Sequence, residues 1–315
     1  MRYRPLGRTG LQLSVLGLGT SPFGGAFGEA DESESRACLH RAIDLGINYI
    51  DTSPFYGLTR SESVLGRALR GIPRDRYLLS TKVGRYGDRI EDFDFSAARV
   101  KRSIDESLAR LGVDHVDIVL CHDIEFGSIA QVIDEAIPAL REVIREGKAR
   151  FLGVSGLPLK VFRDVLTRTD IDGVLSYCHL TLSDTTLLDL LPQLEDRQVG
   201  VINASPMGMG LFTEQGPPSW HPAPARVREA CRLAVEHCRR RGVNPARLAL
   251  QFAIGNDRIA STLVGTSAAN QIEENVKWID EPLDPNLLAE IREILRPIHN
   301  VTWPSGRPEN SDEPR

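Results

Sequence analysis

Four polar side chains stand at or just after the ends of predicted strands, and their types could transfer or steer protons. Asp51 ends the second predicted strand, Tyr56 follows it by five residues, Lys82 ends the third strand, and His122 follows the fourth. A phenol with a pKa near ~10 acts as a general acid or base near neutrality only if a cation stabilises its phenolate. A lysine at about 4 Å and an effective dielectric of about 20 would contribute roughly 4 kcal/mol, or about three pK units. We therefore predict proton transfer at Tyr56, tuned by Lys82.

Each of these residues also has an ordinary structural explanation. An aspartate after a strand often caps a turn, and a tyrosine usually packs. A lysine at a strand end is commonly solvated, and a single histidine is more often a satisfied core or surface group than a catalyst. The prediction of chemistry therefore depends on a fold that brings the four together, with Asp51 holding Lys82 in place.

The elements that would position these residues are eight short β-branched runs, most of them followed by an amphipathic helical stretch. This alternation is typical of βα units and a parallel sheet. The predicted strands are Val15–Leu18, Asn48–Asp51, Tyr77–Lys82, Val116–Cys121, Ala149–Ser155, Gly173–Tyr177, Gly200–Ala204 and Ser261–Val264. Two of the predicted helices, Ser96–Leu111 and Ile129–Glu146, are each followed by a glycine.

Eight such units without a linker or a change in composition favour one (β/α)8 TIM barrel over residues 1–315. In such barrels the active site lies at the C-terminal ends of the strands, where the four residues fall. We expect the opening segment, in which Leu6-Gly7-Arg8-Thr9-Gly10 lies between short polar and apolar stretches, to form an N-terminal hairpin that plugs the barrel floor. An extra C-terminal helix over Asp284–Leu295 and a following loop complete the prediction, and the polar residues 307–315 are predicted to be disordered.

Composition excludes several classes of function. The net charge of −5 gives no reason to expect a nucleic-acid or acidic-membrane partner. No run of eighteen apolar residues and no apolar leader are present, so we expect a cytoplasmic protein. The five cysteines include no C-x-x-C pair, and we expect them to be reduced core residues. No metal-ligand spacing is present, no metal is expected, and no obligate protein partner is indicated.

Three segments carry a resemblance to a known family. The segments INYIDTSPFYG, LLSTKVG and IVLCHDIEFGS, which contain the four residues, resemble the aldo-keto reductase family. The opening LGRTGLQLSVLGLGTSPFGG and the late TLVGTSAANQIEENV resemble the cofactor-binding segments of that family, so the likeness covers nearly the whole chain. It implies that Tyr56 transfers the proton, that Lys82 tunes it, that Asp51 pairs with Lys82, and that His122 orients the substrate oxygen.

Several loops resemble those of sugar-oxidising members of the family, namely CHDIEFGS, LSYCHLTL and NVTWPSG. This likeness implies oxidation of L-galactose, or of a similar aldose such as L-fucose, at the anomeric carbon to a lactone. Besides Tyr56 and His122, four residues are plausible sugar contacts because carboxylates bind hydroxyls and aromatic rings stack on sugar faces. They are Phe23, Asp123, Glu125 and Trp303.

The expected cofactor is NAD, held without a Rossmann motif because no G-x-G-x-x-G follows the first strand. The segment GTSAANQIEEN contains no lysine or arginine to meet a 2′-phosphate, and a carboxylate at Glu274 would repel one. The cofactor-binding residues that the family resemblance implies are Gly19, Thr20, Asp51, Ser155, Ser176, Ser205, Leu211, Gly265, Ser267, Gln271, Glu274 and Asn275. Two positions depart from many relatives: Ser155-Gly156 replaces Ser-Asn, and Ala204-Ser205 replaces a nicotinamide-stacking tyrosine.

Other functions remain open at this point. A pyridoxal or other aldehyde dehydrogenase of the same family would share the four site residues. A non-catalytic subunit that binds the dinucleotide and reports redox state to a partner such as a potassium channel is a candidate of another class. A lyase or isomerase on the same barrel is disfavoured, because the sequence shows neither a metal-ligand cluster nor a phosphate-binding glycine loop after the seventh strand.

Overall fold

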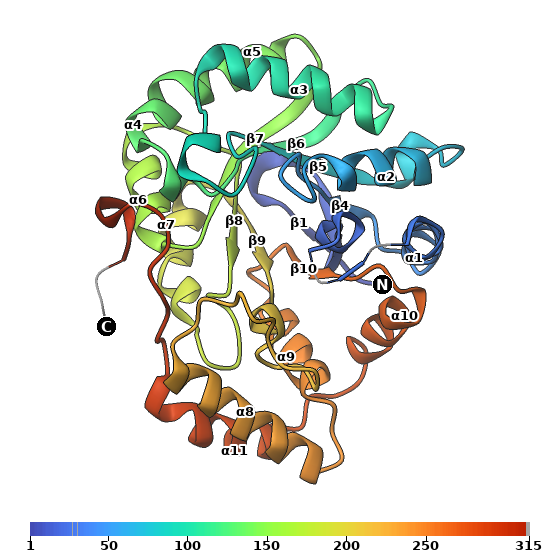
Figure 1. Cartoon of the computed structure of the whole chain (residues 1–315), viewed down its shortest axis with the longest axis vertical. Coiled ribbons are helices and arrows are strands. Elements are labelled where there is room, and N and C mark those ends of the chain that lie inside the picture. The colour runs from blue at the N-terminus through green and yellow to red at the C-terminus, as the bar shows by residue number, and fades with distance from the viewer. Residues whose placement is uncertain (27, 30, 313–315) are drawn as a thin grey trace.

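The computed structural model describes residues 1–26, 28–29 and 31–312. Its centre is a closed barrel of eight parallel strands, each hydrogen-bonded to the next, with the last strand pairing with the first (Figure 1). The strands are β3 (Leu16–Gly19), β4 (Tyr49–Asp51), β5 (Leu78–Val83), β6 (Val116–Cys121), β7 (Ala149–Gly156), β8 (Gly173–Tyr177), β9 (Gly200–Ala204) and β10 (Ser261–Gly265). The predicted TIM barrel is confirmed.

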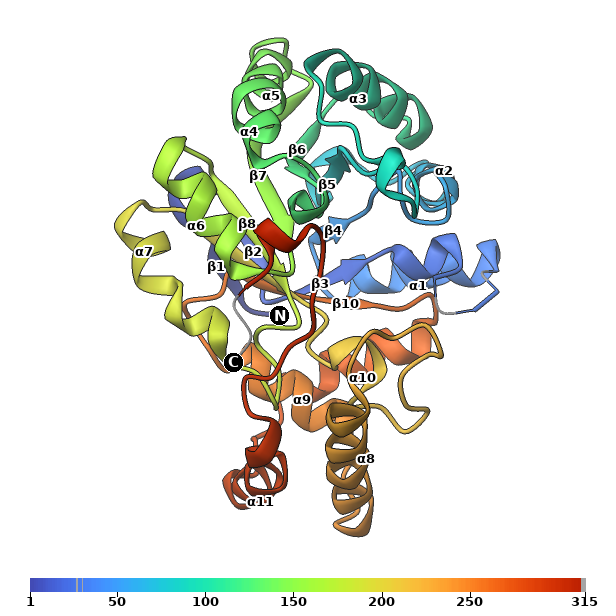
Figure 2. The same cartoon turned by 60° about the vertical axis from the view of Figure 1, so that its left-hand side comes forward.

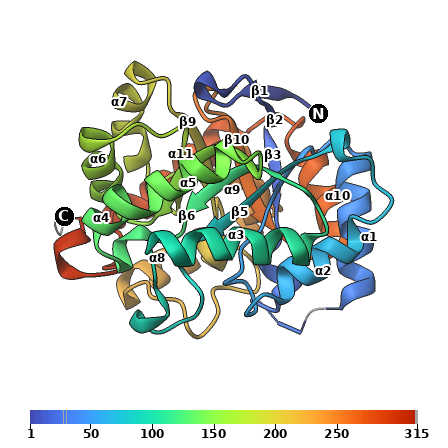
Figure 3. The ribbon, with the colours of Figure 1, turned by 90° about the horizontal axis from the view of Figure 1, so that it is seen from above.

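Helices surround the barrel and bury its outer face, which explains why strands such as β6 are apolar on both faces. The longer helices are α1 (Glu32–Asp44), α2 (Arg60–Ala68), α3 (Ala97–Leu111), α5 (Ile137–Arg145), α6 (Leu159–Arg168), α8 (Ala225–Arg240), α9 (Pro245–Ile254), α10 (Ala269–Trp278) and α11 (Pro285–Leu295), with the short α4 (Ile129–Gln131) and α7 (Leu191–Asp196). Figures 1 and 3 both show α3 and α5 lying side by side over the strands that they cover.

The predicted helix over residues 129–146 is interrupted. It consists of α4, a π-helical stretch at Val132–Ala136, and α5. Pro138 at the start of α5 has no backbone N–H to donate to the preceding turn, and a π turn absorbs that defect.

The N-terminal hairpin covers the barrel end at which the strands begin. Strands β1 (Tyr3–Pro5) and β2 (Gln12–Ser14) pair in antiparallel fashion around a 3-10 turn at Gly7–Thr9. Leu6 and Leu13 pack in one apolar cluster with interior barrel residues such as Ile118. A side chain at Gly200 would collide with Leu6, because its Cβ would lie 2.4 Å from that residue. The hairpin therefore plugs the floor as expected.

The C-terminal segment runs from α11 along the outside of the barrel to the loop after β6. Helix α11 packs against α8, as Figures 1 and 2 show, and the chain then crosses the loop after β6. We call residues 303–312 the C-terminal strap. The prediction of a disordered tail is wrong for residues 307–312, and residues 313–315 lie outside the described part. Asn310 is buried and donates hydrogen bonds to the carbonyls of Glu125 and Gly127, a long-range contact that composition alone does not reveal.

Within residues 1–26, 28–29 and 31–312, no helix is long and apolar enough to cross a membrane, and no group of three or more metal-ligating side chains could hold a metal ion. The five cysteines are buried and unpaired, in agreement with their expected role as core residues.

Candidate active site

Lys82 is the centre of the candidate site. Its ammonium group lies 2.5 Å from Asp51 Oδ2, 2.9 Å from the Thr52 carbonyl and 3.0 Å from Tyr56 Oη. An ammonium has three N–H donors, so these three acceptors satisfy it completely. The side chain is only 1% exposed, which makes the Lys82–Asp51 ion pair a buried one.

Strand pairing explains how Lys82 meets Asp51. In the β4–β5 pair Asp51 lies opposite Ser80, and Lys82 follows two residues later on the same face of its strand. Ser80 donates to Asp51 Oδ1 at 2.7 Å, so both carboxylate oxygens are bound. The resulting chain of contacts fixes the carboxylate before any ligand arrives.

Tyr56 lies in a tight loop that two glycines hold in place. The loop continues through Gly57, Leu58 and Thr59, all with positive φ, although only glycine adopts this conformation without strain. Gly24 and Gly57 touch through their backbones, since a Cβ on Gly57 would lie 2.2 Å from the Gly24 carbonyl. This contact clamps the turn that carries the phenol.

His122 follows β6 and lies beside Tyr56, with the two rings perpendicular and their centroids 5.7 Å apart. Its Nδ1 is 2.9 Å from Ser53 Oγ, which also accepts a hydrogen bond from the Phe55 N–H. No other acceptor for the Ser53 hydroxyl is found among the described residues. We therefore assign Ser53 as the donor to Nδ1, which leaves the ring proton on Nε2.

On the Nε2 side of His122 lies a second ion pair, between a half-buried arginine and a buried aspartate. Asp123 Oδ2 is 3.7 Å from Nε2 and 2.5 Å from Nη1 of Arg85. The Arg85 guanidinium lies 3.4 Å from the centre of the Phe55 ring, a cation–π contact. Arg85 and Asp123 therefore form part of the wall around His122.

The electrostatics of this cluster follow from burial and neighbouring charge. Burial lowers the pKa of Lys82, but Asp51 and Tyr56 together outweigh burial and raise it overall. Burial raises the pKa of Tyr56 by more than Lys82 lowers it. Burial, reinforced by Lys82 and Arg85, holds the pKa of His122 well below its usual value. At neutral pH the cluster therefore contains an ammonium, a neutral phenol and a neutral imidazole.

This balance corrects one expectation. The attraction of Lys82 for the phenolate has the predicted sign, but it does not bring the pKa of Tyr56 below that of a free phenol, because the desolvation of the ring is the larger effect.

Backbone strain marks the same end of the barrel. Asp123, Cys178 and Ser205 follow β6, β8 and β9 within two residues, and their φ angles are 47°, 62° and 57°. Non-glycine residues in this conformation are uncommon and concentrate at functional sites.

The structure brings together only some of the predicted sugar contacts. Asp123 adjoins His122, whereas Phe23 is fully buried in the main apolar core. Glu125 is also fully buried, where it accepts hydrogen bonds from the Leu157 N–H and the Ser305 hydroxyl. Phe23 therefore packs in the core and Glu125 is hydrogen-bonded within the protein, and contact of either residue with a sugar stays a prediction.

Trp303 begins the C-terminal strap and is 8% exposed. Its ring meets His221, from the loop after β9, edge to face at a centroid distance of 5.1 Å. It therefore joins the strap to that loop, and its packing there accounts for its burial.

The residues expected at the cofactor form two groups. At the mouth, Gly19 and Gly265 lie opposite each other on β3 and β10, and their lack of side chains leaves the backbone open. The Ser176 hydroxyl is buried and has no partner among the described residues, so it could receive an amide of a bound dinucleotide. Ser205 and Ser267 are half-buried and follow β9 and β10. Leu211 is buried in an apolar cluster that also contains Phe212 and Trp303.

Other expected cofactor residues are already engaged. Thr20 is buried and donates to the Asp51 carbonyl, and Ser155 accepts a hydrogen bond from the Asp123 N–H. In α10, Gln271 and Glu274 are exposed and Asn275 is buried. These observations fit a dinucleotide that runs from the barrel mouth toward α10.

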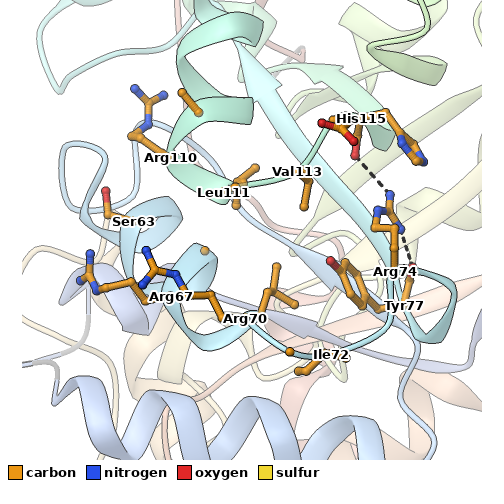
Figure 4. A pocket seen from close by; sticks show the side chains of 16 residues that line it. Ser63, Arg67, Arg70, Ile72, Arg74, Tyr77, Arg110, Leu111, Val113 and His115 are labelled. Carbon is orange, nitrogen blue, oxygen red and sulfur yellow. Dashed lines mark hydrogen bonds between the residues drawn. The ribbon is translucent and has the colours of Figure 1, made fainter.

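A separate cavity of about 600 Å³ lies between α2 and α3, near the ends at which β5 and β6 begin (Figure 4). It is therefore remote from the four residues. Four arginines line it, and three of them already face carboxylates. These pairs are Arg67 with Glu32, Arg74 with Asp117, and Arg110 with Glu62. We do not place the chemistry there.

Sequence reasoning missed two residues of the site, Ser53 and Arg85. Ser53 lies between Asp51 and Tyr56, and Arg85 follows Lys82 by three residues, so proximity to the strand ends was an available signal. Their partners, His122 and Asp123, lie in the loop that follows another strand, β6. Strand order was needed to connect them.

Comparison with known proteins agrees with this geometry. The model of the aldo/keto reductase family matches residues 15–296. An L-galactose dehydrogenase of Arabidopsis thaliana is 51% identical, and the alignment covers 98% of each chain. A pyridoxal 4-dehydrogenase of Microbacterium luteolum is 29% identical, over 92% of this chain and 96% of that protein.

Among solved structures, an aldo-keto reductase from Bacillus halodurans in its holo form superposes with a TM-score of 0.80. It is 27% identical, and the match covers 99% of this chain and 100% of that one. The predicted family resemblance is confirmed: this chain belongs to the aldo/keto reductase family.

Proposed function

We propose that the protein oxidises L-galactose at its anomeric carbon to L-galactono-lactone, with NAD as the hydride acceptor. The observation that carries the proposal is the Lys82 ammonium, which contacts Asp51 and Tyr56 at once and lies beside a neutral His122. This arrangement suits removal of a hydroxyl proton from a neutral substrate. Family membership and the Arabidopsis relative support a sugar dehydrogenase.

Tyr56 is the proposed general base. Its oxygen takes the proton of the C1 hydroxyl as the C1–H bond breaks, and Lys82 stabilises the phenolate that must form beforehand. Asp51 keeps Lys82 charged in a buried position. Because burial raises the pKa of Tyr56, the phenolate fraction is small at neutral pH, and we expect oxidation to accelerate as the pH rises.

His122 is proposed to orient the substrate. With Ser53 bound to Nδ1, the Nε2–H is available to donate to the C1 oxygen, which gains carbonyl character as hydride leaves. The low pKa of His122 keeps the ring neutral, so it donates a hydrogen bond without giving up its proton.

A nicotinamide dinucleotide, when bound, would accept the hydride from C1. We propose Gly19, Ser176 and Gly265 as residues that hold it at the mouth, with Gln271, Glu274 and Asn275 at the adenosine end. The preference for NAD is supported by the lack of cations in residues 265–275. Arg41 approaches α10, but Glu273 binds it at 2.5 Å.

A pyridoxal dehydrogenase is the second candidate, because a pyridoxal 4-dehydrogenase also matches nearly the whole chain. The deciding experiment measures steady-state rates for L-galactose, L-fucose, D-galactose and pyridoxal, each with NAD and with NADP. We expect the highest kcat/KM for L-galactose with NAD. Turnover of pyridoxal without turnover of L-galactose would overturn the proposal, and a tenfold preference for NADP would overturn the cofactor assignment.

A further inference from the structure

We propose that Asp123 binds the hydroxyl on the carbon next to the oxidised carbon, and that Arg85 holds Asp123 in position for this contact. The inference rests on the proposed function and adds a rule for substrate choice. The enzyme would require a hydroxyl donor at C2 of the sugar.

The geometry begins with His122. A C1 oxygen bound to Nε2 lies within ordinary hydrogen-bond distance of it, about 3 Å. Asp123 Oδ2 is 3.7 Å from the same nitrogen, on the side that faces away from Ser53. Oxygens on adjacent sugar carbons are themselves about one hydrogen-bond length apart. A group one carbon away from the reacting centre therefore falls within reach of the Asp123 carboxylate.

The chemistry of a carboxylate then selects the group. The C1 carbon of an aldopyranose adjoins the ring oxygen and C2. A carboxylate can only accept hydrogen bonds, and the ring oxygen has no hydrogen to donate. The C2 hydroxyl is the neighbouring group that can pair with Asp123.

Asp123 has a strained backbone and one carboxylate oxygen without a hydrogen-bond donor in the described part of the chain. The residue is buried and left-handed, with φ at 47°, a conformation that is strained for a residue with a side chain. Oδ2 is bound by Arg85, whereas Oδ1 accepts no hydrogen bond from the described residues. Oδ1 is not among the buried side-chain atoms that lack a partner, so it is accessible and can accept a hydrogen bond from a ligand.

Arg85 is a positioning residue in this scheme. Its guanidinium is fixed by Asp123 on one side and by the face of Phe55 on the other, and its Nε donates to the Gly87 carbonyl at 3.3 Å. Phe55 in turn packs edge-on against His122, with centroids 5.8 Å apart. Arg85 therefore connects the Asp123 carboxylate to Phe55, the residue that packs against the His122 ring.

The test compares L-galactose with 2-deoxy-L-galactose and 2-deoxy-2-fluoro-L-galactose, of which the latter keeps an electronegative group at C2 but cannot donate. The variant Asp123→Gly removes the carboxylate and suits the left-handed backbone. We expect this variant to lower kcat/KM for L-galactose by about 10- to 100-fold. The kcat/KM for each of the two analogues should change less than threefold, because neither analogue has a C2 hydroxyl whose hydrogen bond could be lost. Comparing each sugar with itself across variants cancels differences in intrinsic reactivity.

Two further variants separate recognition from structure. Arg85→Met should reduce the preference for L-galactose over 2-deoxy-L-galactose, mainly through KM, and Arg85→Lys should restore part of it. The control is Asp88→Asn, which removes the other carboxylate near Arg85, 84% exposed and 3.7 Å away, and should leave the preference unchanged.

The outcomes are distinct. If wild-type protein oxidises L-galactose but Asp123→Gly slows all three sugars by the same factor, this inference is overturned and the proposed function stands. If wild-type protein does not oxidise L-galactose, the proposed function itself fails, and this inference fails with it. Circular dichroism and thermal melting of each variant establish that the fold is retained.

Discussion

Replacing Lys82 with methionine removes the cation and keeps the length of the side chain. At the observed 3.0 Å separation of Nζ and Tyr56 Oη, and at an effective dielectric of about 20, the attraction between ammonium and phenolate is about 5.5 kcal/mol. This corresponds to roughly four pK units. Since burial already raises the pKa of Tyr56, the variant would hold its phenol almost entirely protonated at pH 7.

We expect Lys82→Met to lower the rate of L-galactose oxidation at pH 7 by about 10²- to 10⁴-fold, the range typical of lost general-base catalysis. Its rate should go on rising toward alkaline pH beyond the point at which the wild-type rate levels off. The assay follows formation of the reduced dinucleotide between pH 6 and pH 10, with Lys82→Arg as the variant that keeps a cation.

Stability must be separated from chemistry in this experiment. Breaking a buried ion pair on one side costs about 3–5 kcal/mol, because Asp51 would remain charged and unpaired. The double variant Asp51→Asn with Lys82→Met removes both charges and should recover much of the stability without recovering activity. A Lys82→Met protein that oxidises L-galactose within threefold of wild type at pH 7 would refute the reasoning.

The other predictions concern single side chains. Tyr56→Phe should reduce hydride transfer by at least about 10³-fold while the dinucleotide dissociation constant, from fluorescence titration, changes little; near-normal turnover would contradict the assignment. Ser53→Ala should lower kcat by roughly tenfold and Ser53→Thr should restore it, and nitrogen NMR of labelled His122 should report a protonated Nε2 in wild type; a protonated Nδ1 would contradict the assigned tautomer. Burial raises the pKa of Glu125 to about 8, above its value in the unfolded chain, so the stabilisation present below about pH 4.5 is lost as the pH rises to 8. Glu125→Gln should lack this pH dependence. The free energy of unfolding of the variant minus that of wild type, measured by chemical denaturation, should therefore be larger at pH 8 than at pH 4.5 by roughly 3–5 kcal/mol. Parallel pH profiles of the two proteins would rule out a buried, protonated Glu125.

Much of the fold was accessible from the sequence because its signals are local and repeated. Each barrel strand was found within about one residue, since continuous β-branched runs bounded by turns are distinctive. The π turn before Pro138 and the ordered strap were not found. Both depend on which hydrogen bonds the surrounding structure offers, and for Asn310 these come from carbonyls more than 180 residues away.

Only part of the candidate site could be predicted from the sequence, because some of its contacts join parts of the chain that are distant in sequence. Asp51, Lys82 and His122 could be proposed because they stand at strand ends, and the closed barrel gives all strand ends one common rim. The same logic gave no means to distinguish Asp123, which faces His122, from Glu125, which turns into the protein two residues later. That difference is set by a single left-handed residue, and local sequence does not encode it clearly.

The electrostatic balance at Tyr56 was also beyond the sequence. Pairwise attraction to Lys82 can be estimated from residue types, but the opposing desolvation depends on how deeply the ring is buried. The sequence led us to expect a lowered pKa for the Tyr56 phenol. The structure instead indicates a raised pKa, from which we expect the oxidation rate to increase with pH.

The most direct test of the central claim uses L-galactose that carries deuterium at C1, with NAD and the wild-type protein. The account predicts that the deuterium appears in the reduced dinucleotide, that the sugar product is the lactone, and that Tyr56→Phe abolishes the transfer. Consumption of L-galactose without deuterium in the dinucleotide, or no consumption under conditions in which another substrate is oxidised, would contradict it.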